Sequence, residues 1–233
     1  GFNAAATNLS RPVPTYMPEY DFPDTAKVRN VILMIGDGMG IPQAYAAYTV
    51  NGGLTMFNMD KTAFVKTNSK NRYTTDSAGA GSSIATGTQN SNGRISMSDD
   101  GVPYTSITEI LTANGIPCGV VSLGNIVDAT PAAFYAHASD RDAIYEISEC
   151  LTDGHVTFVC GSDHRAFIER PDSVNLYDVL KSQYRITDCT DDIDLNGCKE
   201  ICIDDRMGKF ATEEAIDYLA EITDKSLKKM DAA

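Results

Sequence analysis

The sequence has few of the features that define membrane-spanning or nucleic-acid-binding proteins. Its longer apolar runs, such as residues 31–35, fall far short of the roughly 18 residues that a membrane-spanning helix needs. The 233-residue chain has 19 Lys and Arg against 32 Asp and Glu, a formal charge of −13, and no basic block. Because nucleic acids and anionic lipids bind clustered cations, neither is an expected partner. The composition predicts a globular protein with a buried core.

Cysteine is also sparse. Six cysteines are too few for a disulfide scaffold of this length, so they predict mainly buried thiols. One disulfide among the last three is an open alternative: Cys189, Cys198 and Cys202.

The first residues of the chain differ in composition from the remainder. Residues 1–26 are rich in Pro, Asn and small side chains, which predicts an extended N-terminal arm. Neither an initiator Met nor a signal peptide is present, as is typical of a processed chain, and export is left open.

Strand-like and helix-like segments alternate after the arm. Short apolar runs predict strands at residues 30–35, 64–67, 118–122 and 156–160. Helix signals follow residue 42 and cover residues 75–87, 106–114, 140–149, 176–181 and 212–230. This alternation predicts an α/β fold with a doubly wound, mainly parallel sheet that has helices on both faces. Functional residues of such sheets lie at the carboxyl ends of the strands.

The first candidate motif is the turn GDGMG at residues 36–40. Its glycines do not have the Gly-x-Gly-x-x-Gly spacing of a dinucleotide site, and Asp37 would repel a pyrophosphate. A carboxylate there would bind a cation or cap the following helix, and the segment alone leaves both interpretations open.

The second motif is TTDSAGAG at residues 74–81. Ser77 lies at the start of a helix of small residues, where the helix dipole and free backbone N–H groups favour an anion. An ordinary Ser N-cap is the alternative interpretation.

The third motif, DATPAAFYAHASDR at residues 128–141, begins where a strand should end. If the backbone is extended there, Asp128 and Thr130 project to the same side and offer oxygen ligands to a hard cation such as Mg²⁺. Arg141 presents a planar fork for two phosphate oxygens.

Together the three motifs resemble the alkaline phosphatase family in order and spacing, over residues 28–168 and more loosely beyond. The resemblance implies metal-dependent hydrolysis of small phosphate monoesters with Zn²⁺, two per site, and Mg²⁺ as cofactors. It implies that Ser77 is the nucleophile that forms a phosphoserine, and that Arg141 clamps the phosphate.

The resemblance also implies the metal ligands. Asp37 would bridge a zinc and a magnesium, Thr130 would ligate the magnesium, and Asp128 would lie in its outer shell. Ser77 would contact a metal as well as act as the nucleophile. Asp76 would orient Arg141 or the turn. Members are commonly exported homodimers, which implies a periplasmic or extracellular location.

The sequence departs from the family in its histidines. The remaining zinc ligands belong to a later half in the family, and we find no counterpart in this chain. His137, His155 and His164 cannot build a binuclear zinc site. We expect Asp163 and His164 to replace a glycine-rich turn rather than bind metal, and His137 to be structural. Residues 27–233 are therefore expected to be the amino-terminal part of one catalytic domain.

Several alternatives remain. The chain could be a catalytically incomplete or degenerate phosphate-binding or metal-binding protein of the same fold, or a related phosphodiesterase. A sulfatase would need a cysteine-based nucleophile motif that we do not find. Residues 192–197 match the first half of a calcium loop, but the twelfth position is Ile203 rather than Glu, so we interpret them as an acidic turn.

Overall fold

The computed structural model describes residues 28–59, 61–209 and 212–233. The chain forms two compact units, Gly1–Lys66 and Thr67–Ala233, which are described separately. The predicted arm at residues 1–26 lies outside the described residues.

The first unit contains the predicted helix after the GDGMG turn. Helix α1 (Ile41–Asn51) has Pro42 in its first turn, where the missing N–H costs nothing. Gly40 is its N-cap, and the backbone N–H of Gly40 donates to Gln43 Oε1 at 3.1 Å. A short 3-10 helix, η1 (Thr55–Asn58), follows. The helix prediction is confirmed.

The strands predicted at residues 30–35 and 64–67 are wrong. Neither segment forms a strand, and Val31 and Phe64 are 86% and 92% exposed. A strand exists only through hydrogen bonds to a neighbouring strand. The described residues of the first unit form none, so apolar sequence alone does not produce one in this segment.

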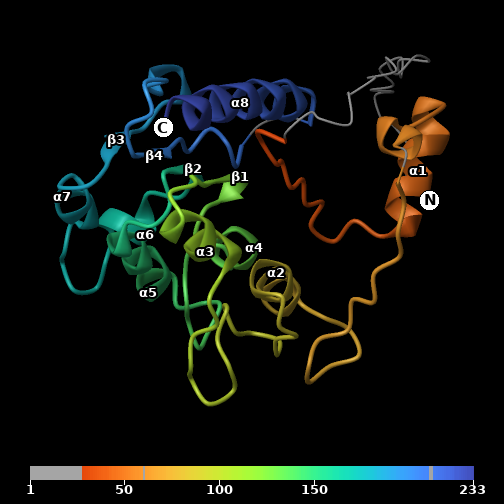
Figure 1. The fold of residues 1–233 in the computed structure, drawn as a ribbon, viewed down its shortest axis with the longest axis horizontal. Helices are drawn as coiled ribbons and strands as arrows, with labels where there is room; N and C mark the ends of the chain where they lie inside the picture. Colours follow the sequence, from red (N-terminus) through yellow and green to blue (C-terminus); the bar gives the residue numbers. More distant parts are fainter. Residues whose placement is uncertain (1–27, 60, 210–211) are drawn as a thin grey trace. The chain divides into compact units, whose positions relative to one another are not determined.

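The second unit is built on a four-stranded parallel sheet (Figure 1). Its strands lie in the order β1 (Gly119–Asn125), β2 (Phe158–Ser162), β4 (Glu200–Ile203) and β3 (Arg185–Thr187). Register pairs such as Val120 with Val159 and Val159 with Ile201 align the three longer strands. The strands predicted at 118–122 and 156–160 are confirmed as β1 and β2, with shifted bounds, whereas β3 and β4 were not predicted.

Helices connect these strands. They are α2 (Ser77–Thr86), α3 (Ile107–Ala113), α4 (Ala129–Ala132), α5 (Ile144–Glu149), α6 (Arg165–Ile168), α7 (Leu176–Leu180) and α8 (Thr212–Ala232), with 3-10 turns η2 (Cys150–Asp153) and η3 (Thr190–Asp192). All the helices predicted in this unit are present. None of the described helices is long and apolar enough to cross a membrane.

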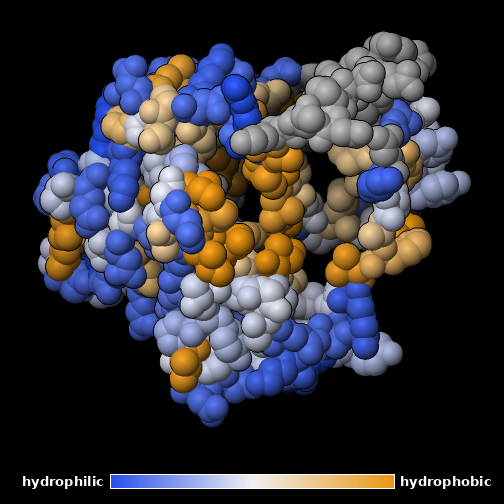
Figure 2. Space-filling model, in the orientation of Figure 1, coloured by the Kyte–Doolittle hydropathy of each residue, from blue (hydrophilic) through white to orange (hydrophobic). Residues whose placement is uncertain are grey.

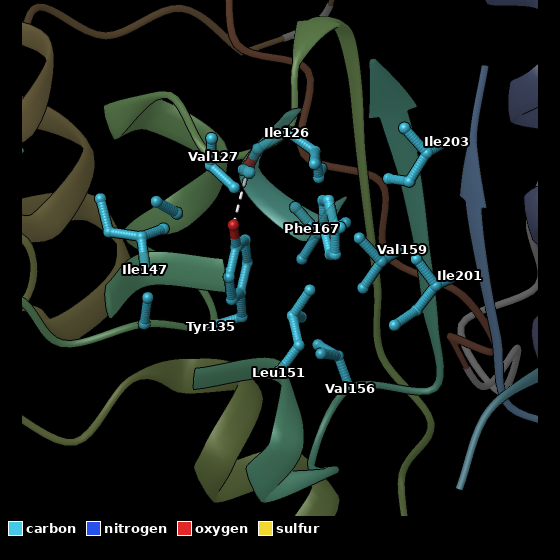
Figure 3. Close-up of a cluster of buried hydrophobic side chains, with 14 of the residues drawn as sticks. Ile126, Val127, Tyr135, Ile147, Leu151, Val156, Val159, Phe167, Ile201 and Ile203 are labelled. Carbon is cyan, nitrogen blue, oxygen red and sulfur yellow. Dashed lines mark hydrogen bonds between the residues drawn. The ribbon is translucent and has the colours of Figure 1, made fainter. Parts of the chain in front are cut away.

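Both faces of the sheet are covered. Successive strand residues point to opposite faces, so Val159 packs into a core with Tyr135 and Phe167, where the Tyr135 hydroxyl donates to Ile126 O at 2.9 Å (Figure 3). Phe158 packs on the other face against Ile222 of α8. The predicted α/β fold, with a parallel sheet and helices on both faces, is confirmed.

The exterior of the second unit also carries apolar side chains. Ile107, Ile110 and Ile116, on and after α3, are 42–48% exposed. Orange apolar surface interrupts the blue and white exterior in Figure 2. Isolated exposed apolar residues are ordinary in globular proteins.

The cysteines form no disulfide. All six are free thiols, so the alternative of one bridge among the last three is wrong. Cys189 Sγ instead accepts from Arg206 Nη2 at 3.2 Å, and Cys198 Sγ lies 3.6 Å from an oxygen of Asp194. Cys202 is fully buried in the sheet, where no exposed thiol can reach it.

Candidate active site

Helix α2 presents Ser77 in its first turn. Asp76 is the N-cap, and its Oδ1 accepts from the backbone N–H of Gly79 at 2.8 Å. The alternative that Ser77 is itself the N-cap is therefore wrong, because the preceding carboxylate takes that position. Ser77 is the first helical residue and is partly exposed, at the end of the helix where partial positive charge favours an anion.

Two glycines allow α2 to approach its neighbours. A Cβ atom added to Gly81 would lie 3.3 Å from both Thr130 Cα and Ala133 Cβ of α4. A Cβ on Gly79 would lie 3.1 Å from Asn92 Oδ1. These small residues cost helix propensity, but they place the Ser77 helix directly against the helix that carries Thr130.

Asp128 follows the carboxyl end of β1, at the edge of the sheet where we expect functional residues. It is the N-cap of α4, and its Oδ1 accepts from the backbone N–H of Ala129 at 2.7 Å. The condition of an extended backbone is met at Asp128, with φ of −68° and ψ of 160°, but not at Thr130, because the helix starts at Ala129. Thr130 instead lies in the first turn of α4, two residues after the carboxylate.

Arg141 contacts the N-cap residues of both α2 and α4. Its Nη1 lies 3.4 Å from Asp76 Oδ2, and its Nη2 donates to Asp128 Oδ1 at 3.0 Å. Partial burial opposes the charged form, but the two carboxylates outweigh it and raise the pKa of Arg141. Its side chain is still 27% exposed, so the guanidinium is both oriented and accessible.

Asp37 belongs to the first unit and is described there. It lies in a turn in which the backbone N–H of Met39 donates to Gly36 O at 3.0 Å and Gly38 has φ of 68°. Since Gly40 is the N-cap of α1, the alternative that Asp37 caps this helix is wrong. The structure brings Asp76, Asp128 and Arg141 into contact, with Ser77 and Thr130 in the same two helices.

Comparison with known proteins identifies the family. The family description "Alkaline phosphatase" matches residues 28–168, more than half of the chain. The chain belongs to the alkaline phosphatase family.

Relatives match half or more of the chain. Alkaline phosphatase 4 of Bacillus subtilis (strain 168) is 36% identical over 143 residues, which are 57% of this chain and 31% of the relative. Streptomycin-6-phosphate phosphatase of Streptomyces griseus is 40% identical over 126 residues, 50% of this chain and 28% of that protein. The chain thus spans less than a third of the length of these two relatives.

A solved alkaline phosphatase has the same fold. The enzyme from the Antarctic bacterium TAB5 matches with a TM-score of 0.76 at 28% identity, over 84% of this chain and 59% of that one. A variant of the same enzyme with Mg bound in its M3 site matches with a TM-score of 0.75. That variant thus holds a magnesium ion in a fold that this chain shares.

The histidines of this alkaline phosphatase homologue do not gather around a metal. His137 is structural, as expected: its Nδ1 lies 2.9 Å from Ser96 O and its Nε2 3.3 Å from Glu109 Oε1. Burial lowers the pKa of His155. Within the described ranges, no three His, Cys, Asp or Glu side chains are grouped to hold a metal ion. These residues do not fit a zinc centre.

Asp163 has a backbone conformation that explains the glycine expected there. Its φ is 85°, in the left-handed region that glycine adopts freely and that Asp tolerates by bonding locally. Its carboxylate accepts from Arg165 Nε at 2.8 Å and from Asn125 Nδ2 at 2.7 Å. The hydrogen bond from Arg165 is the main cause of the lowered pKa of Asp163. His164 Nδ1 lies 2.9 Å from the Tyr177 hydroxyl. Asp163 thus bonds both within the turn and to β1, and His164 contacts α7.

The start of α4 offers oxygen donors. The Asp128 carboxylate is 60% exposed and Thr130 lies in the first turn of the helix, and carboxylate and hydroxyl oxygens are the atoms that Mg²⁺ prefers.

Sequence reasoning gave no role to residues 92 and 93. The Gly93 N–H donates to Asp76 Oδ2 at 2.9 Å, on the carboxylate that also contacts Arg141. The signal available was the Asn-Gly pair itself, which favours a tight turn with positive φ.

Proposed function

We propose that the chain carries the nucleophile and phosphate-binding part of a metal-dependent phosphate monoesterase that works through a phosphoserine at Ser77. One observation supports this most: Arg141 is held between Asp76, which caps the helix of Ser77, and Asp128, which caps the helix of Thr130. The guanidinium of Arg141 thus contacts the caps of both helices, and Ser77 and Thr130 lie in the first turns of those helices.

In the proposed reaction, Ser77 Oγ attacks phosphorus while the bond to the ester oxygen breaks and the alcohol leaves. Arg141 donates two N–H groups to non-bridging oxygens, and Asp76 and Asp128 keep its guanidinium in that orientation. Water then cleaves the phosphoserine and releases phosphate. Asp128 and Thr130 would hold a divalent cation, which would supply positive charge that offsets the charge of the phosphoryl group.

The proposal extends to the groups outside these helices. We propose that Asp37 is a metal ligand of the whole enzyme and that its cofactors are Mg²⁺ and two Zn²⁺. Zinc takes part in none of the steps above, since the described residues group no zinc ligands. The substrates would be small phosphomonoesters, loosely discriminated because recognition centres on the phosphoryl group. Export to the periplasm or the medium, and a homodimer, complete the proposal.

Substitution of the nucleophile tests the reaction. We expect Ser77→Ala to lower turnover of p-nitrophenyl phosphate, with Zn²⁺ and Mg²⁺ added, by about three orders of magnitude or more, because the covalent route is lost. Brief reaction with ³²P-labelled substrate and an acid quench should label the parent protein on Ser77 but not the variant. Unchanged turnover in Ser77→Ala would remove the proposed mechanism.

A second function is favoured by the lack of grouped zinc ligands among the described residues. In that case the chain binds phosphate through Ser77 and Arg141 without turnover. Titration calorimetry with inorganic phosphate, together with metal analysis by plasma spectrometry, separates the two: a binding protein retains phosphate affinity with little zinc and no turnover. Turnover of bis(p-nitrophenyl) phosphate above that of the monoester would indicate a phosphodiesterase.

A further inference from the structure

The side chain of Asn92 is hydrogen-bonded to the turn that precedes Ser77. Asn92 Oδ1 accepts from the backbone N–H of Asp76 at 3.2 Å, and its Nδ2 donates to Thr74 O at 3.2 Å. One amide thus pairs with both polar groups that flank residue 75, as a neighbouring strand would. The backbone N–H of Asn92 donates to Asn71 Oδ1 at 3.0 Å, so Asn92, which clamps the turn at residues 74–76, is itself held in place.

The next residue connects the same turn to Arg141. The N–H of Gly93 donates to Asp76 Oδ2 at 2.9 Å, and Gly93 O accepts from the backbone N–H of Arg141 at 2.8 Å. The N–H of Gly93 therefore bonds to Asp76, the cap of the Ser77 helix, and its C=O bonds to the backbone of Arg141. The φ of 81° at Gly93 is in the left-handed region, which makes glycine the favoured residue there.

Close packing fixes the clamp against α2. The lack of a side chain at Gly79 lets Asn92 pack closely, since a Cβ there would lie 3.1 Å from Asn92 Oδ1, nearer than most Cβ contacts. Asn92 is thus set by contacts on three sides: Asn71, the turn at 74–76, and the first turn of α2.

We propose that the dipeptide Asn92-Gly93 is a positioning element that sets the geometry between Ser77 and Arg141. This inference rests on the proposed function of those two residues. Neither Asn92 nor Gly93 is assigned a contact with substrate; the dipeptide acts through the backbone of residues 74–76 and of Arg141. A nucleophile displaced by about 1 Å can lose about 100-fold in rate, so such a clamp affects turnover more than binding.

A matched pair of variants tests the inference in the full chain. Asn92→Ala removes both side-chain bonds to the turn. Asn90→Ala removes a bond in the same segment, from Asn90 Nδ2 to Arg94 O at 3.1 Å, and leaves residues 74–76 untouched. We expect Asn92→Ala to lower kcat by about 10- to 100-fold with KM changed less than about threefold, and Asn90→Ala to leave kcat within about twofold.

A second measurement does not depend on activity. In ¹H–¹⁵N spectra, Asn92→Ala should shift the amide signals of Ser77 and Arg141, whereas Asn90→Ala should not. If Asn92→Ala does not fold, Asn92→Asp has the same shape, keeps an acceptor for the Asp76 N–H and loses the donor to Thr74. If the parent has no turnover, the proposed function fails and the spectra still decide the inference. Unshifted Ser77 and Arg141 signals, or equal kcat in both alanine variants, would overturn it.

Discussion

The carboxylate of Asp76 has two functions in the structure, and each uses a different oxygen. Oδ1 caps α2 through Gly79, while Oδ2 accepts from Gly93 and contacts Arg141. A cap needs only a hydrogen-bond acceptor, but orienting a guanidinium also needs negative charge. An uncharged side chain of the same shape therefore separates the two functions.

We expect Asp76→Asn to keep most of the stability of the helix and lose much of the activity. Unfolding free energy should fall by about 1–2 kcal/mol, since Asn is as good an N-cap as Asp but its Nδ2 cannot accept from the Gly93 N–H. The ratio kcat/KM should fall about tenfold or more because Arg141 loses one of its two anionic partners. Urea denaturation and p-nitrophenyl phosphate kinetics measure the two effects.

Asp99→Asn is the matched control for Asp76→Asn. Asp99 pairs with Lys70 at 2.8 Å on the surface of the same unit, so its substitution removes the same charge away from Arg141. Equal kinetics in the two variants would contradict the assigned role of Asp76.

Some of these residues could be identified from the sequence and some could not. Ser77, Asp128 and Arg141 lie in short motifs of fixed spacing, so the sequence alone identifies them as candidates. Asn92 gives no such signal, because its partners are backbone groups at Thr74 and Asp76, and the sequence does not record which loop passes beside them.

Contact between α2 and α4 sets the distance between the two helix starts. Gly81 is the point of closest approach, with Thr130 Cα and Ala133 Cβ facing it. These are a backbone atom and a methyl group rather than the end of a flexible side chain, so neither can rotate away from an added atom.

We expect Gly81→Ala to lower kcat and to leave stability unchanged or reduced. Alanine should add about 1 kcal/mol of helix propensity, but the added Cβ must push α4 away, which displaces Thr130 and Asp128. Chemical denaturation and steady-state kinetics measure the balance. The reverse substitution at the neighbouring position, Ala80→Gly, calibrates propensity alone, and a Gly81→Ala variant stabilised with full activity would refute the close approach.

An ion pair with both partners buried links α8 to the sheet. Lys229 Nζ lies 2.9 Å from Glu200 Oε2 on β4, and both side chains are fully buried. Glu200 Oε1 also accepts from Arg185 Nη1 at 2.7 Å and from Thr187 Oγ1 at 3.0 Å on β3. The pair lies at the junction of α8 with the last two strands of the sheet.

We expect Lys229→Met alone to destabilise the second unit by up to about 3–5 kcal/mol, because it removes the only fully buried one of the two cations, Lys229 and Arg185, that pair with the buried Glu200 carboxylate. The double variant Lys229→Met with Glu200→Gln should recover a large part of that loss. Urea denaturation of the single and double variants forms the test. Strictly additive losses would show that the two residues do not interact.

The elements of the fold were predictable to different degrees. β1 and β2 are apolar runs between helix signals, and α8 has a long amphipathic pattern. β3 and β4 were missed because they are only three and four residues long and hold polar residues: Arg185, which is exposed, and Glu200, whose burial depends on partners elsewhere. Residues 30–35 show the opposite error, since a strand pattern yields no strand without a neighbour in the described residues of its unit.

At the scale of the whole molecule, we expect the stability of the second unit to fall at low pH. Burial opposes ionisation of Asp204, but hydrogen bonds from Arg206 and from the backbone of Thr190 outweigh it and lower its pKa to about 2. Arg206 Nε donates to Asp204 Oδ1 at 2.9 Å, and the Tyr218 hydroxyl of α8 lies 3.1 Å from Oδ2. This carboxylate therefore ties the end of β4 to α8.

The sign of the pH effect is set by the direction of that shift. A carboxylate whose pKa is lower in the folded state stabilises the fold above its unfolded value of 3.8, and this contribution is lost as the pH falls towards 2. The contribution is on the order of 2 kcal/mol. We expect Asp204→Asn to be less stable than the parent at pH 7 and to show a flatter decline between pH 4 and pH 2 in urea denaturation. Parallel curves would contradict this assignment.

The hydrogen bonds of Asn92, and that of Arg141 with Asp128, join residues that are close along the chain, whereas the contact of Arg141 with Asp76 is long-range. Asn92 bonds to residues 16 and 18 positions away, and Arg141 to Asp128 13 positions away, with the Arg141 contact to Asp76 spanning 65. Short loops cost little entropy to close. The ribosome also makes Arg141 before any residue of β2, β4 or α8. The hydrogen bonds around Ser77 can therefore form on the nascent chain while the sheet that will support them is still being synthesised.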